Sequence, residues 1–189
     1  HLCEKHNDIH LDVFSSFKIY GWEEADKQFE PLYDEIRNHP QMTYHGFAQQ
    51  DELRKAVQQA HILAYPSKWK ETSCRVLMES MSAGLLCIHS NLAALPDTAG
   101  GLTSMYQYSD DIKEHGPTFA SYLNFGIEKI KNEDINGYLK FVKAYADTRF
   151  NITNISNHWK ATMGDLKAQY PTVESRKIPS EMFVYKTKP

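Results

Sequence analysis

Short apolar runs alternate with helical patterns along the first half of this chain, and that order constrains the fold more than any other feature. Strands are expected at residues 11–14, 42–45, 61–65, 85–89 and 103–106, the first continuing irregularly through 15–20. Helices are expected at residues 23–38, 51–60 and 74–83. Strands joined by crossover helices run parallel to one another. The pattern therefore predicts an α/β fold, a Rossmann-like doubly wound parallel sheet with helices on both faces.

The pattern changes after residue 108, where helical stretches follow one another without strands, at 112–131, 134–148 and 154–169. Four apolar residues repeat at helical spacing in the last stretch: Ile155, Trp159, Met163 and Leu166. Asn154 or Ser156 is the expected N-cap of that helix. We expect an α/β domain over residues 1–110, a helical extension packing on it over 111–170, and a polar tail over 171–189.

Composition limits the class of protein. The chain has 189 residues, of which 41% are hydrophobic and 24% charged, as in an ordinary globular domain. A net charge of −3 argues against a nucleic-acid partner, which requires a basic face. Cys3, Cys74 and Cys87 are odd in number and lack C-x-x-C spacing, which predicts free thiols and a cytoplasmic location. No apolar run is long enough to predict a transmembrane segment.

The segment from His61 to Gly84 carries the clearest functional signal. An apolar strand pattern ends near Pro66, and a helix without a strong breaker begins near Cys74. Free N–H groups and the positive dipole end of such a helix form an anion site. Glu71 lies in the loop before the helix and Glu79 lies two turns inside it. Carboxylates that accept bonds from hydroxyls, beside amides that hold phosphate, supply the chemistry needed to bind a sugar nucleotide.

The spacing of Glu71 and Glu79 is an E-x7-E arrangement with characteristic flanks. They are Met42–Phe47, Tyr65-Pro66-Ser67, Leu77–Gly84, the strand at 85–89 and Asn91–Asp97. Together they resemble the C-terminal donor-binding domain of retaining GT-B glycosyltransferases (family 4, or group 1, type). The resemblance covers residues 11–106, and the helical C-terminal tail is compatible with it.

The resemblance implies transfer of a sugar, with retention at the anomeric carbon, from a nucleotide diphosphate sugar to a glycan, lipid or protein acceptor. The donor would be a UDP- or GDP-sugar, the enzyme would be hexosyltransferase-like, and neither a metal nor another cofactor would be required. Glu71 is implied as the catalytic residue that orients the donor sugar, and Glu79 as the residue that binds the ribose hydroxyls. The other implied donor-binding residues are Thr72, Ser73, Cys74, Arg75 and Val76 beside the diphosphate, and Gly46 and Phe47 at the base.

The same resemblance implies that this sequence is a fragment. Family members hold the donor diphosphate with an arginine and a lysine on a loop after the first strand of this domain, and no residue here corresponds to that pair. The N-terminal acceptor domain is likewise without a counterpart. We therefore expect the fragment alone to be inactive, and any peripheral membrane association to arise through the missing half.

Each candidate residue also has a simpler interpretation. Glu71 could be a solvated loop charge, and Glu79 could form an i,i+4 ion pair with Arg75. Thr72 or Ser73 could serve only as an N-cap. His6 and His10 have the spacing of a metal pair, but without further ligands they more often lie on a solvated face.

Two other functions remain open for the whole chain. One is a different GT-B-shaped enzyme, such as a sugar-nucleotide epimerase or a phosphorylase, which would need catalytic histidines or a cofactor-bearing lysine. The other is a non-catalytic nucleotide-binding or interaction module. Nothing near Cys74 in the sequence nominates a base that would make its thiol a nucleophile.

Overall fold

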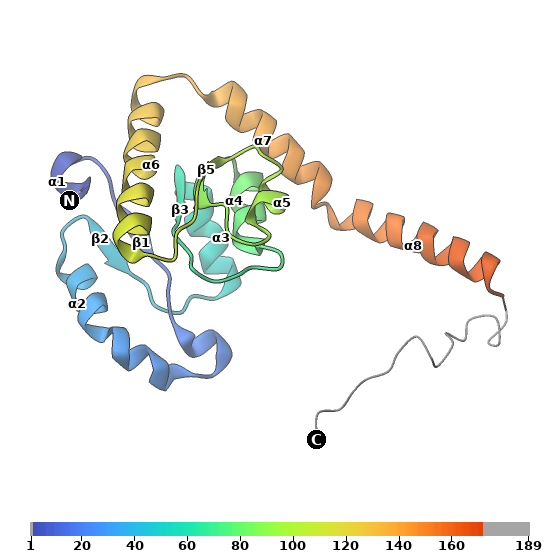
Figure 1. Ribbon diagram of the computed structural model, residues 1–189, viewed down its shortest axis with the longest axis horizontal. Helices are drawn as coiled ribbons and strands as arrows, with labels where there is room; N and C mark the ends of the chain where they lie inside the picture. Colours follow the sequence, from blue (N-terminus) through green and yellow to red (C-terminus); the bar gives the residue numbers. More distant parts are fainter. Residues whose placement is uncertain (1, 172–189) are drawn as a thin grey trace. The chain divides into compact units, whose positions relative to one another are not determined.

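The computed structural model describes residues 2–171 and confirms the alternating order of strands and helices (Figure 1). The elements are α1 (Leu2–Lys5), β1 (Leu11–Val13), η1 (Phe17–Tyr20), η2 (Glu23–Phe29), α2 (Glu30–Asn38), β2 (Met42–Tyr44), α3 (Gln50–Gln59), β3 (Ile62–Tyr65), α4 (Arg75–Ala83), β4 (Leu86–Ser90), α5 (Leu95–Ala99), β5 (Ser104–Tyr106), α6 (Ile112–Asn132), α7 (Asn136–Arg149) and α8 (Ile152–Gln169). A division into two compact units falls after Ala146, within α7. No helix among the described residues has the length and apolarity to cross a membrane.

All strand pairs are parallel, as the βαβ order predicts, but they form two sheets. β1 pairs with β2, from Leu11 opposite Met42 to Val13 opposite Tyr44. β3, β4 and β5 form the second sheet with β4 in the centre. The α/β class and the parallel direction are therefore confirmed, and the sheet is interrupted between β1 and β3 across residues 2–171.

The core surrounds β4, all of whose residues are buried. Leu86 and Ile88 pack against α6, where Gly126 allows close approach: a Cβ on this glycine would lie 2.5 Å from Ile88 Cδ1. α4 also packs on β4 and contributes Leu77 and Met81, both fully buried. A strand covered in this way is an apolar run without alternation, which explains why 85–89 could be recognised in the sequence.

Two predicted elements have a different form. Residues 17–20, expected as an irregular strand, form the 3-10 helix η1, whose cap residue Ser16 accepts a bond from Lys18 N. The helix expected over 23–38 begins as the 3-10 helix η2 and becomes α-helical only at Glu30. The cause is local, because Asp26 accepts bonds from Ser16 Oγ and Phe17 N and holds η2 against η1.

The three predicted C-terminal helices are present, with one correction at a cap. Asn151, and not Asn154 or Ser156, caps α8: its side chain accepts bonds from Thr153 N and Asn154 N. The helix therefore starts two residues before the expected position. The expected tail lies outside the described residues beyond Pro171, and the expected domain boundary at residue 110 stays a prediction.

Candidate functional site

The carboxyl ends of β2 and β3 face the same edge of the molecule. Gln50, the first residue of α3, follows β2, and Arg75 and Glu79 on α4 follow β3. Gln50 Nε2 lies 3.2 and 3.1 Å from Glu79 Oε1 and Oε2, and Arg75 donates to Gln50 Oε1 at 3.0 Å. The candidate site is therefore built from both sheets, at the edge where ligands bind in open α/β domains.

Glu71 is half-buried in the loop between β3 and α4 and is held from two directions. Tyr65 Oη at the end of β3 donates to Glu71 Oε1 at 2.8 Å. Ala94 N donates to the backbone oxygen of Glu71 at 3.2 Å. Its neighbour Ala93 has φ 51°, a left-handed conformation that alanine rarely adopts. A carboxylate fixed in this way is not the freely solvated loop charge of the simpler interpretation.

The hydrogen bond between Tyr65 and Glu71 also affects the tyrosine. Burial, and next the bond to the Glu71 carboxylate, raise the pKa of Tyr65. The phenol therefore stays protonated at neutral pH and donates to the carboxylate. Among residues 2–171, no hydrogen bond reaches the second oxygen of Glu71, which leaves it available to a ligand hydroxyl.

Glu79 has both an intramolecular ion pair and partial exposure. Arg75 Nε lies 3.8 Å from Glu79 Oε1, so the i,i+4 pair predicted as the simpler interpretation exists. The Arg75 side chain is 73% exposed, whereas that of Glu79 is 29% exposed. An exposed pair of this length contributes little to stability. Gln50 is the closer partner and spans both carboxylate oxygens.

The first turn of α4 lacks the side-chain cap that the sequence predicts. The N-cap residue is Cys74, no side chain caps the helix by a hydrogen bond, and Thr72 and Ser73 are exposed in the loop. The capping interpretation of Thr72 or Ser73 is therefore wrong. Because no oxygen from these residues occupies the helix end, the amides of Arg75 and Val76 are those that an anion would meet first.

Cys74 itself is a buried residue, 1% exposed. Burial raises the pKa of its thiol, although the backbone amides of Leu77 and Val76 act in the opposite direction. Burial thus outweighs the helix terminus, which alone would lower the pKa. The thiol is not activated as a nucleophile, in agreement with the absence of a candidate base near it in the sequence.

Gly46 and Phe47 follow β2 and are half-buried. Gly46 has φ 65°, so a side chain at this position would be strained. His45 stacks on Phe14, with ring centroids 4.4 Å apart, and its Nε2 lies 2.7 Å from Asp12 Oδ1. His45 therefore packs at the strand end. Gly46 and Phe47 lie on the same edge as Glu79, but no hydrogen bond joins either residue to it in the described part of the chain.

The most important site residues that sequence reasoning missed are Gln50 and Tyr65. Gln50 lies 29 residues before Glu79, and no motif links the two positions. Tyr65 was noted only as part of the Tyr-Pro-Ser motif, although its position six residues before Glu71 places it at the end of the same strand. The available signal was an aromatic residue with a polar hydroxyl at the end of an apolar strand.

No group of three metal-ligating side chains comes together within residues 2–171. His6 and His10 have separate partners, since His6 Nε2 contacts Asn124 Oδ1 and His10 Nε2 contacts Thr43 Oγ1. His6 is buried, so the expectation that both histidines lie on a solvated face is wrong for His6. All three cysteines are free, as predicted.

Comparison with known proteins places this geometry in a family. The family model described as glycosyl transferases group 1 matches residues 2–100. The fold is similar to that of the pneumococcal O-GlcNAc transferase GtfA, solved in complex with UDP and GlcNAc, with a TM-score of 0.65 and 14% identity over 86% of this chain and 30% of that one. The GtfA/B complex gives a TM-score of 0.63 and 13% identity over 88% and 31%. No curated protein matches the chain.

At 14% and 13% sequence identity, the two solved structures establish only the fold of this chain, which is that of GT-B glycosyltransferases. The chain spans just under a third of the length of each solved neighbour. The family model covers more than half of the 189 residues, including the carboxyl edge, Glu71 and Glu79. The chain thus belongs to the group 1 glycosyl transferases.

Proposed function

We propose that this chain is the donor-binding part of a retaining glycosyltransferase that uses a nucleotide diphosphate sugar. The observation that carries the proposal is the placement of two carboxylates on one edge, on either side of an uncapped helix N-terminus: Glu71 before α4 and Glu79 within it. Backbone amides at a helix N-terminus bind phosphate, and carboxylates bind hydroxyls. A sugar nucleotide presents both kinds of group.

In this proposal each carboxylate has one task. Glu71, positioned by Tyr65, contacts the hydroxyls of the donor sugar. Glu79, oriented by the two contacts from Gln50, binds the ribose hydroxyls through its remaining lone pairs. The amides of Arg75 and Val76 at the start of α4 stabilise the departing diphosphate, where negative charge develops. No residue is assigned as a general base.

The nucleotide and the acceptor are also proposals. UDP is the first nucleotide to test, because the similar pneumococcal enzyme binds UDP and GlcNAc in its crystal. GDP is the second. A glycan, lipid or protein would be the acceptor, bound by polypeptide outside this chain, so we expect residues 1–189 alone to transfer no sugar. A cytoplasmic location and a role in glycan biosynthesis follow from the same proposal.

The test is titration of the chain with UDP, GDP and ADP by NMR. Half of a binding site is expected to bind near the millimolar level, about −4 kcal/mol, so the method must detect weak affinity. Binding of one nucleotide, with shifts in Arg75 and Val76 amides, supports the proposal. Glu79→Ala should then weaken binding about tenfold or more, as expected for loss of a charged hydrogen-bonding partner. Glu133→Ala, an exposed glutamate on another element, is the matched control.

A second set of titrations separates the roles of the two carboxylates. Glu71→Gln should leave UDP affinity unchanged and reduce only the additional affinity for the UDP-sugar. If Glu71→Gln weakens UDP and the UDP-sugar equally, the sugar-orienting role is wrong. If no nucleotide binds at millimolar concentration, residues 1–189 do not form the donor site alone and the non-catalytic module becomes the better description.

A further inference from the structure

The turn between η1 and η2 carries two aromatic side chains that face solvent. Tyr20 is 66% exposed and Trp22 is 64% exposed, and their ring centroids lie 5.7 Å apart with an angle of 37° between the ring planes. Ile19 beside them is 63% exposed. Single exposed apolar residues are ordinary, whereas a contiguous exposed apolar patch marks a surface that binds something. Residues 19–22 therefore form a candidate binding surface.

An open depression lies beside Trp22. It has a volume of about 540 Å³ and is lined by Gly21, Trp22, Glu23, Glu24 and Ala25. Gly21 has φ 73°, and no atom lies within 4 Å of the position that a Cβ would occupy, so this side of the depression is open. The volume falls in the range of small-molecule sites, roughly 300–1,000 Å³. The exposed rings thus adjoin a concave surface large enough for a small ligand.

Two carboxylates line this depression together with the indole ring. Glu23 Oε1 lies 3.5 Å from Lys18 Nζ, and Glu24 Oε2 lies 2.5 Å from Lys27 Nζ. Both ion pairs are exposed and contribute little to stability. Within residues 2–171, no hydrogen bond or ion pair reaches the second oxygen of either glutamate. These oxygens are available to accept hydrogen bonds from ligand hydroxyls.

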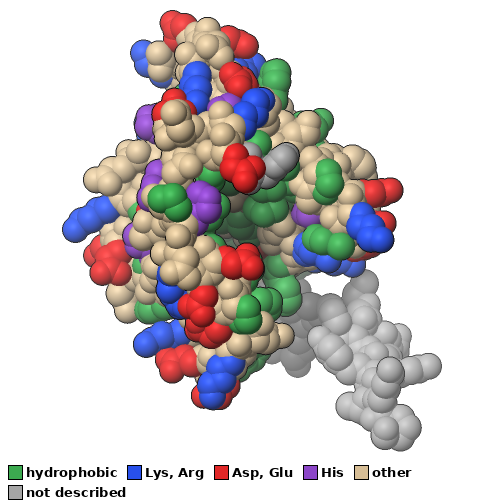
Figure 2. All heavy atoms as spheres, turned by 90° about the vertical axis from the view of Figure 1, so that its left-hand side faces the viewer, with side chains coloured by type: hydrophobic (Ala, Val, Ile, Leu, Met, Phe, Trp, Pro, Cys, Tyr) green, Lys and Arg blue, Asp and Glu red, His purple; other side chains and the backbone are tan. Residues whose placement is uncertain are grey.

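Charge determines which ligands this surface can bind. Residues 16–30 contain two lysines and four acidic residues, a net charge of −2. Figure 2 shows acidic side chains interspersed with basic ones on the lower part of the face that carries α1 and α2. A phosphate, a nucleic acid or an anionic membrane would meet this negative charge and be repelled. We therefore expect an uncharged ligand that offers hydroxyl donors.

The turn itself is fixed by hydrogen bonds. Trp22 N donates to Phe17 O at 3.2 Å, which closes the turn. Asp26 at the start of η2 accepts bonds from Phe17 N at 2.9 Å and from Ser16 Oγ at 2.6 Å. A surface that is already ordered loses little conformational entropy when a ligand binds. The two exposed rings are therefore presented on a preorganised segment.

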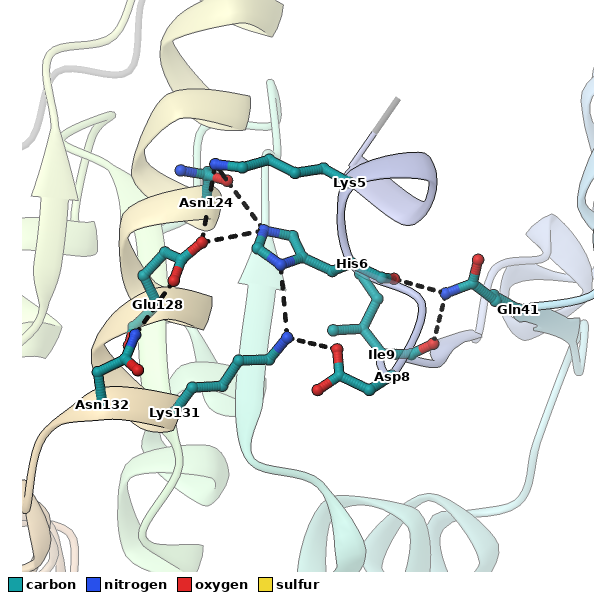
Figure 3. Close-up of polar contacts among 9 residues, drawn as sticks. All are labelled: Lys5, His6, Asp8, Ile9, Gln41, Asn124, Glu128, Lys131 and Asn132. Atoms are coloured by element: carbon teal, nitrogen blue, oxygen red, sulfur yellow. Dashed lines mark hydrogen bonds and ion pairs between the residues drawn. The ribbon is translucent and has the colours of Figure 1, made fainter.

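The segment is also anchored to its neighbours on both sides. Before it, Gln41 Nε2 donates to His6 O at 2.7 Å and to Ile9 O at 3.0 Å, which holds the chain that enters β1 (Figure 3). After it, Tyr33 of α2 stacks on Tyr44 of β2, with ring centroids 4.3 Å apart. The packing of this part of the fold thus rests on other aromatic residues, and the two outward rings are available for a ligand.

We propose that Tyr20 and Trp22, with the two carboxylates of the depression, bind a neutral carbohydrate. One face of a pyranose ring consists of C–H groups, whose partial positive charge is attracted to the negative face of an aromatic ring. Hydroxyls at the edge of the sugar would donate to Glu23 and Glu24, and an ionised acceptor strengthens such bonds. Two aromatic rings 5.7 Å apart can contact successive sugars of an oligosaccharide. No donor-site residue takes part, so the inference is independent of the proposed function.

The test is NMR titration of the 189-residue chain with neutral trisaccharides: cellotriose, maltotriose, mannotriose and N-acetylated chitotriose. The readout is the indole N–H signal of Trp22. At least one trisaccharide should shift this signal with a dissociation constant of about 1–10 mM, the weak affinity expected of a shallow surface. The indole of Trp159, 59% exposed on α8, is the internal reference and should not shift. Because no nucleotide is present, failure of the donor site would leave this result unchanged.

Variants at the aromatic residues separate stacking from simple apolar contact. Trp22→Ala and Trp22→Leu should each weaken binding by about tenfold, whereas Trp22→Phe, which keeps an aromatic face, should stay within about threefold of the original chain. The backbone amides of Gly21 and Ala25 report binding in these variants. Trp159→Ala is the matched control for loss of an exposed indole and should leave affinity unchanged. Circular dichroism melts establish that each variant folds.

The double variant Glu23→Gln, Glu24→Gln tests the carboxylates. It should weaken binding by about tenfold, because neutral acceptors form weaker bonds to hydroxyls than ionised ones do. Glu133→Gln, an exposed glutamate outside the turn, is the control and should leave affinity unchanged. An unchanged affinity in the double variant would remove the carboxylates from the proposed site.

Three results would overturn the proposal. The first is the absence of a shift at Trp22 with any trisaccharide at millimolar concentration. The second is an equal shift at Trp159, which would mean that the sugars act on any exposed indole. The third is a Trp22 signal that responds to neutral lipid vesicles or to protein concentration instead of sugar, which would identify a membrane or a second copy of the chain as the occupant.

Discussion

The side-chain amide of Gln50 spans the carboxylate of Glu79, with Nε2 at 3.2 Å from one oxygen and 3.1 Å from the other. The contact joins the first residue of α3 to the middle of α4, and Arg75 completes it by donating to Gln50 Oε1. The carboxylate is therefore oriented before any ligand arrives. Preorganisation of this kind reduces the ordering cost of binding.

Gln50→Ala should weaken nucleotide binding by up to about tenfold, less than Glu79→Ala, because it removes one orienting hydrogen bond and keeps the carboxylate. NMR titration with UDP measures the difference. Gln59→Ala, exposed at the far end of α3, is the control and should leave affinity unchanged. Equal losses in the Gln50 and Gln59 variants would show that helix stability, and not the contact with Glu79, is responsible.

Tyr65→Phe should lower the free energy of unfolding by about 1.5–3 kcal/mol, the range for a hydrogen bond to a charged group. The reason is the 2.8 Å bond from Tyr65 Oη to Glu71 Oε1. Urea denaturation measures the change. The control is Tyr20→Phe, since Tyr20 is 66% exposed and should tolerate the change. A neutral Tyr65→Phe would mean that the loop holds Glu71 through its backbone alone.

Gly126→Ala should destabilise the fold by about 1–3 kcal/mol, because overpacking a filled core forces its neighbours to move. The new Cβ would lie 2.5 Å from Ile88 Cδ1 and 3.2 Å from Leu86 Cδ2. The control is Gly164→Ala inside α8, which meets nothing within 4 Å and should stabilise that helix by about 0.5–1 kcal/mol.

A double-mutant cycle identifies the atom responsible for the effect of Gly126→Ala. Ile88→Val deletes Cδ1 and should recover most of the loss when the two substitutions are combined, giving a coupling energy of about 1 kcal/mol or more in thermal or urea unfolding. Additive effects would show that Ile88 is not the obstacle.

Stability should fall with acidification through His89. The side chain is fully buried, with Nδ1 2.7 Å from Ser90 O and Nε2 2.7 Å from Thr103 Oγ1, contacts that a neutral ring satisfies. Burial lowers the pKa of His89. The unfolded chain therefore binds the proton first, and stability is lost as pH falls below about 6.5, with a slope of at most about 1.4 kcal/mol per pH unit for this group.

Urea denaturation between pH 7.5 and 5.5 measures that slope. His89→Gln should reduce it, whereas His10→Gln, at an exposed position, should not. An unchanged slope in His89→Gln would assign the acid sensitivity to other groups.

The sequence predicts those features that depend on local pattern. β4 and α4 were recognisable because one is a continuous apolar run and the other ends at Gly84, which adopts φ 86° as a helix C-cap requires. The placement of Glu71 before α4 and Glu79 within it follows from the same pattern. Contacts between residues close in sequence explain the errors. Asn151 caps α8 in place of Asn154, and the bonds that Asp26 accepts favour a 3-10 form at the start of the helix expected over 23–38.

What could not be predicted depends on contacts between distant segments. Gln50 meets Glu79 only because two crossovers bring α3 beside α4. The interruption of the sheet depends on which strands pair, and apolar periodicity does not encode pairing partners. α5 was missed because it has only five residues and includes Pro96.

The bond from Ala94 N to the backbone oxygen of Glu71 separates the scaffold of the loop from its chemistry. Since both atoms belong to the main chain, the side chain at position 71 can be exchanged without removing the hydrogen bond that joins the loop to the start of α5. Variants at residue 71 therefore keep this main-chain bond and change only the bond that the side chain accepts from Tyr65. Under the proposed function, this makes residue 71 a position at which donor preference can be varied while the main-chain hydrogen bond is kept.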